Sequence, residues 1–175
     1  MKHVKLFEKF SGIENRARLS DKMLSTLNEQ IKNELQSSQI YRAISCWLDD
    51  NGWVEASKYY FKSSQEELVH MDKVYSYLFS RNCKAVVPAV DKVEGEFKDI
   101  RDILEISLEH EIAVSEEWNV IADLAIKEGD NPTYEFACFF QKEQVEEEEK
   151  FRNLLFKMNL DIPNYELDEL FGELV

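Results

Sequence analysis

Four glutamates and one histidine stand at positions where a helical pattern predicts buried side chains. They are Glu34, Glu67, His70, Glu111 and Glu147. A buried, ionised carboxylate is strongly destabilising unless a partner compensates its charge, so such a cluster needs either protons or cations. Four carboxylates carry four negative charges, and two divalent ions supply four positive ones. The residue types therefore predict a site for two metal ions.

The donor atoms of this cluster indicate which metals it prefers. Carboxylate oxygens are hard ligands, and the i, i+3 step from Glu67 to His70 adds one imidazole nitrogen on the same helix face. This set suits iron or manganese better than the thiolate-rich sites of copper(I) or structural zinc. Three cysteines without CxxC spacing indicate neither a disulfide framework nor a thiolate site. We expect iron, in a protein of the reducing cytoplasm.

Each member of the cluster belongs to a stripe that repeats every three or four residues, the spacing of one helix face. The stripes predict four long helices, at Leu24 to Leu48, Ala56 to Tyr77, Ile100 to Ala125 and Phe136 to Met158. All five residues fall near the middle of their helices. In a bundle with near-parallel axes they should therefore meet at one level.

The connections between the stripes predict how the helices are joined. Turn signals at residues 49–52 and 128–132 are short, so each links two antiparallel helices. Residues 81–98 contain Pro88 and Gly95 but no sustained helical period, and this segment is long enough to cross the bundle. We expect an all-α fold of two antiparallel hairpins joined by a long crossover. Ser20 is the expected N-cap of the first helix, and a short fifth helix is expected after Pro163.

Charge and hydropathy limit the partners of the chain. The excess of 35 Asp+Glu over 21 Lys+Arg gives a net charge of −14 over 175 residues, which repels nucleic acid and anionic membranes but attracts cations. No apolar run approaches the roughly 20 residues of a membrane span, and the basic N-terminus lacks the apolar core of a signal peptide. We expect a soluble cytoplasmic protein that binds metal ions and neither nucleic acid nor membrane.

The acidic run from Glu146 to Glu149 needs separate treatment because acidic runs are usually solvated. Successive helical residues are about 100° apart, so four in a row point in every direction and one of them must face inward. Spacing from neighbouring apolar residues selects Glu147. Glu148 and Glu149 are expected on a solvated face, and His110, which lies off its stripe, is expected to be an ordinary exposed or interface residue.

Local motifs around these residues resemble those of bacterial non-haem ferritins. The resemblance extends from about Asp21 to the C-terminus and rests on NELQSS at 33–38 with Tyr41, QEELVHM at 65–71, Glu111, and EQVEE at 143–147. It implies a ferritin-like four-helix bundle with a short fifth helix. It also implies two parts of the chain, a basic N-terminal extension at 1–20 and a ferritin-like di-iron domain at 21–175.

The resemblance also implies roles for individual residues. Iron site A would be formed by Glu34, Glu67 and His70, and Glu67 would bridge to site B, which Glu111 and Glu147 complete. Two more side chains would lie beside the pair: Gln144 near site B, and Tyr41 as an electron donor or hydrogen-bond partner. A third iron position would be formed by Glu66, Glu143, Glu146 and Glu147.

Two departures from related patterns limit what is implied. Bacterioferritins carry Glu-x-x-His on the last long helix, where this chain has Gln144 to Glu147, and a methionine haem ligand where it has Leu68. No haem is therefore expected. Many relatives carry a tryptophan where this chain has Phe139, so an electron supplied from that position is missing.

The function implied is iron storage with ferroxidase activity. Fe(II) would be oxidised to Fe(III) with O₂ or H₂O₂ at the di-iron site, and ferric mineral would be deposited inside a homo-oligomeric shell of 24 subunits. Two alternatives remain open from the sequence. One is another di-iron carboxylate oxidase or peroxidase on the same bundle, and the other is a non-catalytic helical shell protein whose carboxylates are protonated or salt-bridged.

Overall fold

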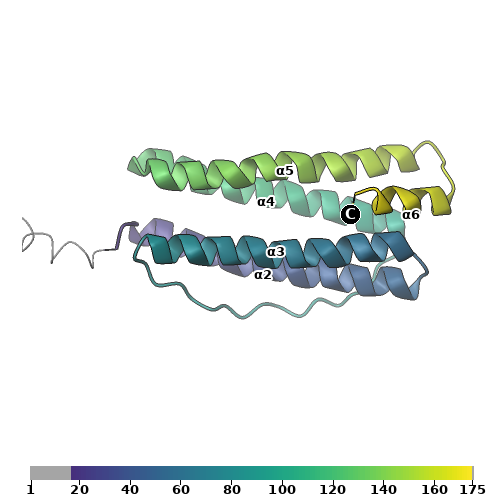
Figure 1. Cartoon of the computed structure of the whole chain (residues 1–175), viewed down its shortest axis with the longest axis horizontal. Helices are drawn as coiled ribbons and strands as arrows, with labels where there is room; N and C mark the ends of the chain where they lie inside the picture. The colour runs from purple at the N-terminus through teal and green to yellow at the C-terminus, as the bar shows by residue number, and fades with distance from the viewer. Residues whose placement is uncertain (1–16, 175) are drawn as a thin grey trace, which may run out of the picture.

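The computed structural model describes residues 17–174 and contains, over that range, five helices and no strand (Figure 1). The helices are α2 (Asp21–Asp50), α3 (Val54–Ser80), α4 (Ile100–Glu128), α5 (Asn131–Met158) and the short α6 (Asn164–Gly172). The prediction of an all-α fold with four long helices and a short fifth one is confirmed. Residues 1–16, most of the predicted extension, lie outside the described range.

Two antiparallel hairpins build the bundle, α2 with α3 and α4 with α5 (Figure 1). The predicted Ser20 cap is present, because the Ser20 side chain accepts a hydrogen bond from the backbone N–H of Met23. Proline stands in the first turn of α5, where its missing N–H costs little. The turn between α4 and α5 depends on Gly129, which ends α4 at φ 70°. Glycine adopts this left-handed conformation without the steric cost that a Cβ atom brings.

The segment between α3 and α4 runs beside the first hairpin along its length, as predicted for a crossover (Figure 1). Side chains of α2 hold it in place. Asn28 Oδ1 accepts a hydrogen bond from the N–H of Val86 at 2.7 Å, and Gln36 Oε1 accepts one from the N–H of Asp91 at 2.8 Å. These bonds satisfy backbone groups of a segment that has no regular partner.

The buried apolar residues form two clusters with a polar layer between them. One cluster contains Ile31 and Val114, and the other contains Tyr41 and Leu104. The buried residues of the layer between them are polar: Glu34, Ser37, Ser38, Ser107, Glu111 and Gln144. The carboxylates predicted to meet at one level are thus positioned between two well-packed ends of the bundle.

The short helix α6 packs across the start of α3. The Asp168 carboxylate accepts hydrogen bonds from the N–H groups of Glu55 and Ala56, at 3.1 and 2.9 Å, while the residue before α3 makes no side-chain cap. Phe171 of α6 is fully buried. Helix α6 therefore supplies the cap that the sequence next to α3 lacks.

No helix in the described part of the chain is long and apolar enough to cross a membrane. The three cysteines form no disulfide, and their environments differ: Cys46 is exposed, Cys83 is buried and Cys138 is half-buried.

Candidate metal centre

The first hairpin contributes a compact group of possible metal ligands. One ligand atom each from Glu34 on α2 and from Glu67 and His70 on α3 lie within 4.8 Å of one another. His70 Nδ1 is 3.3 Å from Glu67 Oε2 and 3.9 Å from Glu34 Oε2. Two oxygens and one nitrogen at this separation can converge on one ion after small side-chain adjustments.

The second hairpin faces this group with Glu111 on α4 and Glu147 on α5. Both line a cavity of about 20 Å³, which we call the inner cavity, together with Tyr41, Tyr59, Ser63, Glu66, Glu67, His70 and Phe151. Glu111 is buried, whereas Glu147 is half-buried. Glu147 is the member of its acidic run that reaches the inner cavity, as its spacing predicts.

Burial raises the pKa values of the inner carboxyl groups. The pKa of Glu34 is well above its usual value, first because of burial and then because of the charge of Glu67. The pKa values of Glu67 and Glu111 are also raised, mainly by burial. Without a cation the cluster therefore holds protons near neutral pH, and a metal ion that binds must release them.

Two side chains hold Glu111 in place. The hydroxyl of Tyr41, which is fully buried, donates to Glu111 Oε1. The amide of Gln144 donates to Glu111 Oε2 at 2.6 Å and to the Glu111 carbonyl oxygen at 3.3 Å. Both carboxylate oxygens thus have a donor, which fixes the orientation of a possible ligand.

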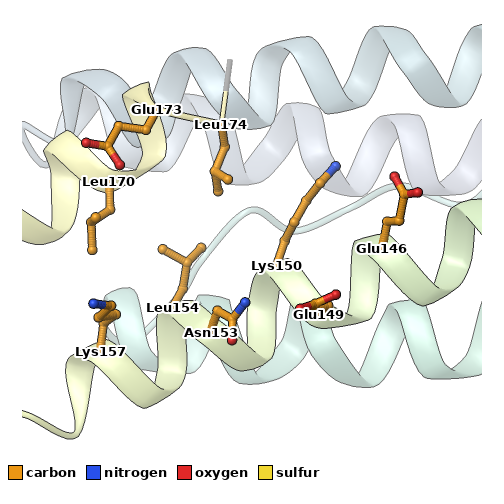
Figure 2. A pocket seen from close by; sticks show the side chains of 9 residues that line it. All are labelled: Glu146, Glu149, Lys150, Asn153, Leu154, Lys157, Leu170, Glu173 and Leu174. Atoms are coloured by element: carbon orange, nitrogen blue, oxygen red, sulfur yellow. The ribbon is translucent and has the colours of Figure 1, made fainter.

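A second cavity, which we call the outer cavity, opens between α3 and α5 next to His70. It measures about 270 Å³ and is lined by Glu66, Val69, His70, Lys73, Glu143, Glu147 and Lys150. Three of the four glutamates expected at a third iron position therefore line one space. The fourth, Glu146, lines a neighbouring groove of about 300 Å³ between α5 and α6, which we call the α5–α6 groove (Figure 2).

Sequence reasoning missed several polar side chains around the site. Gln30 is buried one helical turn before Glu34 and donates to Glu34 Oε1 at 2.9 Å. Lys73 and Lys150 pair with Glu143 and Glu147, at 3.7 and 2.7 Å. The i, i+3 spacing of Glu147 and Lys150 could have indicated their ion pair, but no spacing rule relates Lys73 on α3 to α5.

Two neighbouring residues are less exposed than expected. Of the two alternatives for His110, exposed or interface, the exposed one is wrong, because His110 is half-buried against α2, where its Nε2 lies 2.9 Å from Ser37 Oγ and burial lowers its pKa to about 4. Glu148 is not simply solvated, since it accepts hydrogen bonds from Ser115 of α4 and from Arg152 at 2.7 Å. Both residues face the neighbouring helix of the bundle, beside the apolar stripe. Glu149 is exposed as expected.

Fold and site together define a helical bundle that gathers carboxylates and one imidazole between its four long helices. The chain belongs to the ferritin-like family, since the family model described as a ferritin-like domain matches residues 24–160.

Known ferritins are similar to this protein in sequence and structure over most of its length. The bacterial non-haem ferritin of Staphylococcus saprophyticus is 32% identical over 141 residues, which cover 81% of this chain and 84% of that protein. The bacterial non-haem ferritin of Escherichia coli is 28% identical over 142 residues, with coverage of 81% and 86%. The open-pore ferritin of Archaeoglobus fulgidus superposes with a TM-score of 0.85 at 28% identity and covers 90% of this chain and 98% of that one.

Proposed function

We propose that this protein stores iron and oxidises ferrous ions at the inner cavity. The observation that carries the proposal is that Glu67 and His70 from one hairpin meet Glu111 and Glu147 from the other around one small cavity, and that Glu34 lies next to Glu67 and His70. Four carboxylates balance two divalent ions in charge. The relatives named as bacterial non-haem ferritins support iron as the metal and storage as the purpose.

In this proposal each ligand keeps the role that the resemblance to bacterial non-haem ferritins implies. Glu34 and His70 hold one ferrous ion, Glu111 and Glu147 hold the other, and Glu67 bridges the two. Tyr41 and Gln144 orient Glu111 through their hydrogen bonds. Gln30 does the same for Glu34.

The oxidation itself balances with two iron ions. Two ferrous ions each give one electron to dioxygen, which takes up two protons and leaves as hydrogen peroxide, while both ions become ferric. With hydrogen peroxide as oxidant, the same two electrons and two protons yield two water molecules. The chain contributes geometry and charge, because its carboxyl groups release protons as ferrous ions bind and then stabilise the higher charge of the ferric products.

Storage requires a compartment, and we propose the homo-oligomeric shell of 24 subunits that the resemblance implies. Apolar side chains exposed on α4 are suited to subunit contacts: Ile112, Val120 and Ile126 are 41%, 59% and 62% exposed. We further propose a cytoplasmic location, which the three unpaired cysteines support.

The size of the inner cavity argues against the alternative of an oxidase for an organic substrate. About 20 Å³ is room for ions and dioxygen-sized molecules but far below the roughly 300 Å³ of a typical ligand pocket. A non-catalytic shell protein would gain nothing from carboxyl groups gathered at one level, where burial raises the pKa values of Glu34, Glu67 and Glu111. Metal oxidation therefore fits the geometry best.

Anaerobic titration with Fe(II), followed by addition of O₂, tests the proposal. We expect two ferrous ions to bind per chain and then to oxidise much faster than in buffer, with a native mass that corresponds to an assembly of many subunits. Binding of fewer than two ions per chain, or oxidation no faster than in buffer, would refute the ferroxidase function. A monomeric native mass would refute storage in a shell.

A further inference from the structure

Two lysines at the outer cavity form ion pairs with its carboxylates. Lys150 Nζ on α5 is 2.7 Å from Glu147 Oε1, and Lys73 Nζ on α3 is 3.7 Å from Glu143 Oε1. Both lysines line the outer cavity beside His70. The positions where an entering cation would meet carboxylate oxygens are therefore already next to positive charges of the chain itself.

The charges of the outer cavity set the cost of a further cation. Its lining contains three carboxylates, from Glu66, Glu143 and Glu147, and two ammonium groups, from Lys73 and Lys150. Glu147 also belongs to the inner pair, so once two ions occupy that pair the carboxylates of Glu66 and Glu143 face two ammonium groups and their charges cancel. A divalent ion would then bring the cavity to plus two, and the departure of one ammonium group would lower this to plus one. Binding of the ion and departure of a lysine should therefore be coupled.

A carboxylate oxygen in the outer cavity still lacks a donor. Glu143 Oε2 is buried and accepts no hydrogen bond within the described residues, and His70 Nε2 lies 3.5 Å away from it. A buried acceptor without a partner is uncommon and calls for an explanation. A cation that enters between Glu143 and Glu147 would satisfy this oxygen.

The ammonium group of Lys150 can also reach carboxylates outside the outer cavity. Lys150 lines the α5–α6 groove as well as the outer cavity, and that groove also contains Glu146, Glu149 and Glu173 (Figure 2). The flexible four-carbon stem of a lysine allows its ammonium group to move between such neighbouring carboxylates. Lys73, in contrast, lies over the ring of Phe139 at 4.3 Å, a cation–π contact that holds it in place.

We propose that Lys150 is a movable counter-cation of the outer cavity. It neutralises Glu147 until a divalent ion enters, and it then turns into the α5–α6 groove, where other carboxylates receive its charge. This inference rests on the proposed two-metal function. Its consequence is that the outer position holds a third ion more weakly than the inner pair holds its two ions.

Calorimetric titration with Zn²⁺ tests the inference without any oxidation step. The wild-type chain should bind two ions tightly and a third weakly. Lys150→Met keeps a long side chain but removes the charge, so the third ion should bind about fivefold tighter, the equivalent of roughly 1 kcal/mol for one partly exposed ion pair. Lys58→Met is the matched control, because Lys58 pairs with Glu55 at 2.6 Å on α3 but does not line the outer cavity.

A charge-preserving variant separates charge from shape. Lys150→Arg should bind the third ion as the wild type does. If Lys150→Arg binds it as tightly as Lys150→Met, or if Lys150→Met leaves the third affinity unchanged while two ions bind tightly, the inference about Lys150 is wrong and the proposed function stands. If the wild-type chain does not bind two ions, the proposed function fails.

Discussion

At the scale of single residues, the proposed bridging role of Glu67 distinguishes it from the other carboxylates. Glu67 Oε2 lies 3.3 Å from His70 Nδ1. The carboxyl group of Glu67 also lines the inner cavity, where it faces Glu111 and Glu147 of the second hairpin. Glu146, by contrast, is exposed and lines only the α5–α6 groove. The two residues should therefore contribute to different steps.

Substitution of these two residues should separate rapid oxidation from later turnover. We expect Glu67→Ala to abolish the rapid phase of Fe(II) oxidation, because both proposed iron positions lose a ligand. Glu146→Ala should leave the first turnover near the wild-type rate and change chiefly the later ones. Stopped-flow absorbance of ferric product after O₂ addition measures both phases. Equal effects of the two substitutions on the first turnover would contradict the division between the inner pair and an accessory role for Glu146.

The hydrogen bond from Tyr41 to Glu111 permits a second prediction at this scale. Tyr41→Phe removes the donor and leaves the ring, so Glu111 loses one of its two orienting contacts. Loss of such a contact typically weakens metal binding by about 10-fold to 100-fold. We expect a loss of that size for the second Zn²⁺ ion in calorimetry, with the first ion little changed. Tyr59→Phe, a substitution of another tyrosine on the inner cavity, is the control.

At the scale of helices, much of the fold follows from the sequence, because it depends on local signals. Periodic stripes, the Ser20 cap and Gly129 predict helices and turns that the structure contains. The inward direction of Glu34 and Glu111 follows from the same stripes. The burial of His110 and the pairing of Lys73 with Glu143 depend on how closely two helices approach, which a pattern along one helix does not record.

The cap that α6 provides for α3 gives a prediction about an element. Asp168→Ala removes the acceptor for the N–H groups of Glu55 and Ala56. We expect a loss of about 1 kcal/mol in the free energy of unfolding, the usual size for a lost N-cap. Thermal or urea unfolding followed by circular dichroism measures it. Glu169→Ala, at an exposed position of α6, should have little effect, and its Zn²⁺ stoichiometry, like that of Asp168→Ala, should remain that of the wild type.

At the scale of the whole molecule, the buried carboxyl groups of the metal centre lower the stability of the metal-free fold and raise its affinity for cations. Three buried carboxyl groups with raised pKa values are less costly when protonated, so the metal-free fold loses stability as they ionise. Bound cations reverse the effect, because they stabilise the ionised form. The same groups that weaken the metal-free bundle at neutral pH therefore make metal binding contribute to folding.

The loss of stability on ionisation of these carboxyl groups predicts how the melting temperature depends on pH. A carboxyl group whose folded pKa is raised stabilises the fold below its unfolded value near 4.5, and this contribution is lost as pH rises toward the folded pKa. His110, whose pKa falls from 6.5 to about 4, acts in the opposite direction, but only below pH 6.5. Above that value the carboxyl groups should dominate, and the melting temperature of the metal-free protein should fall as pH rises toward about 8, the pKa to which burial raises Glu67.

Calorimetric melting of three samples checks the sign. The metal-free wild type should show the fall, Glu34→Gln should show a smaller one because an amide does not titrate, and the Zn²⁺-loaded wild type should show a flat or rising trend because its carboxylates are already ionised. A melting temperature that is independent of pH in the metal-free wild type, or a fall of equal size in Glu34→Gln, would contradict the link between the cluster and stability. Repulsion among the acidic residues outside the site, which gives the chain most of its net charge of −14, is the same in all three samples. A different pH trend in the Zn²⁺-loaded sample therefore reports on the carboxyl groups of the site.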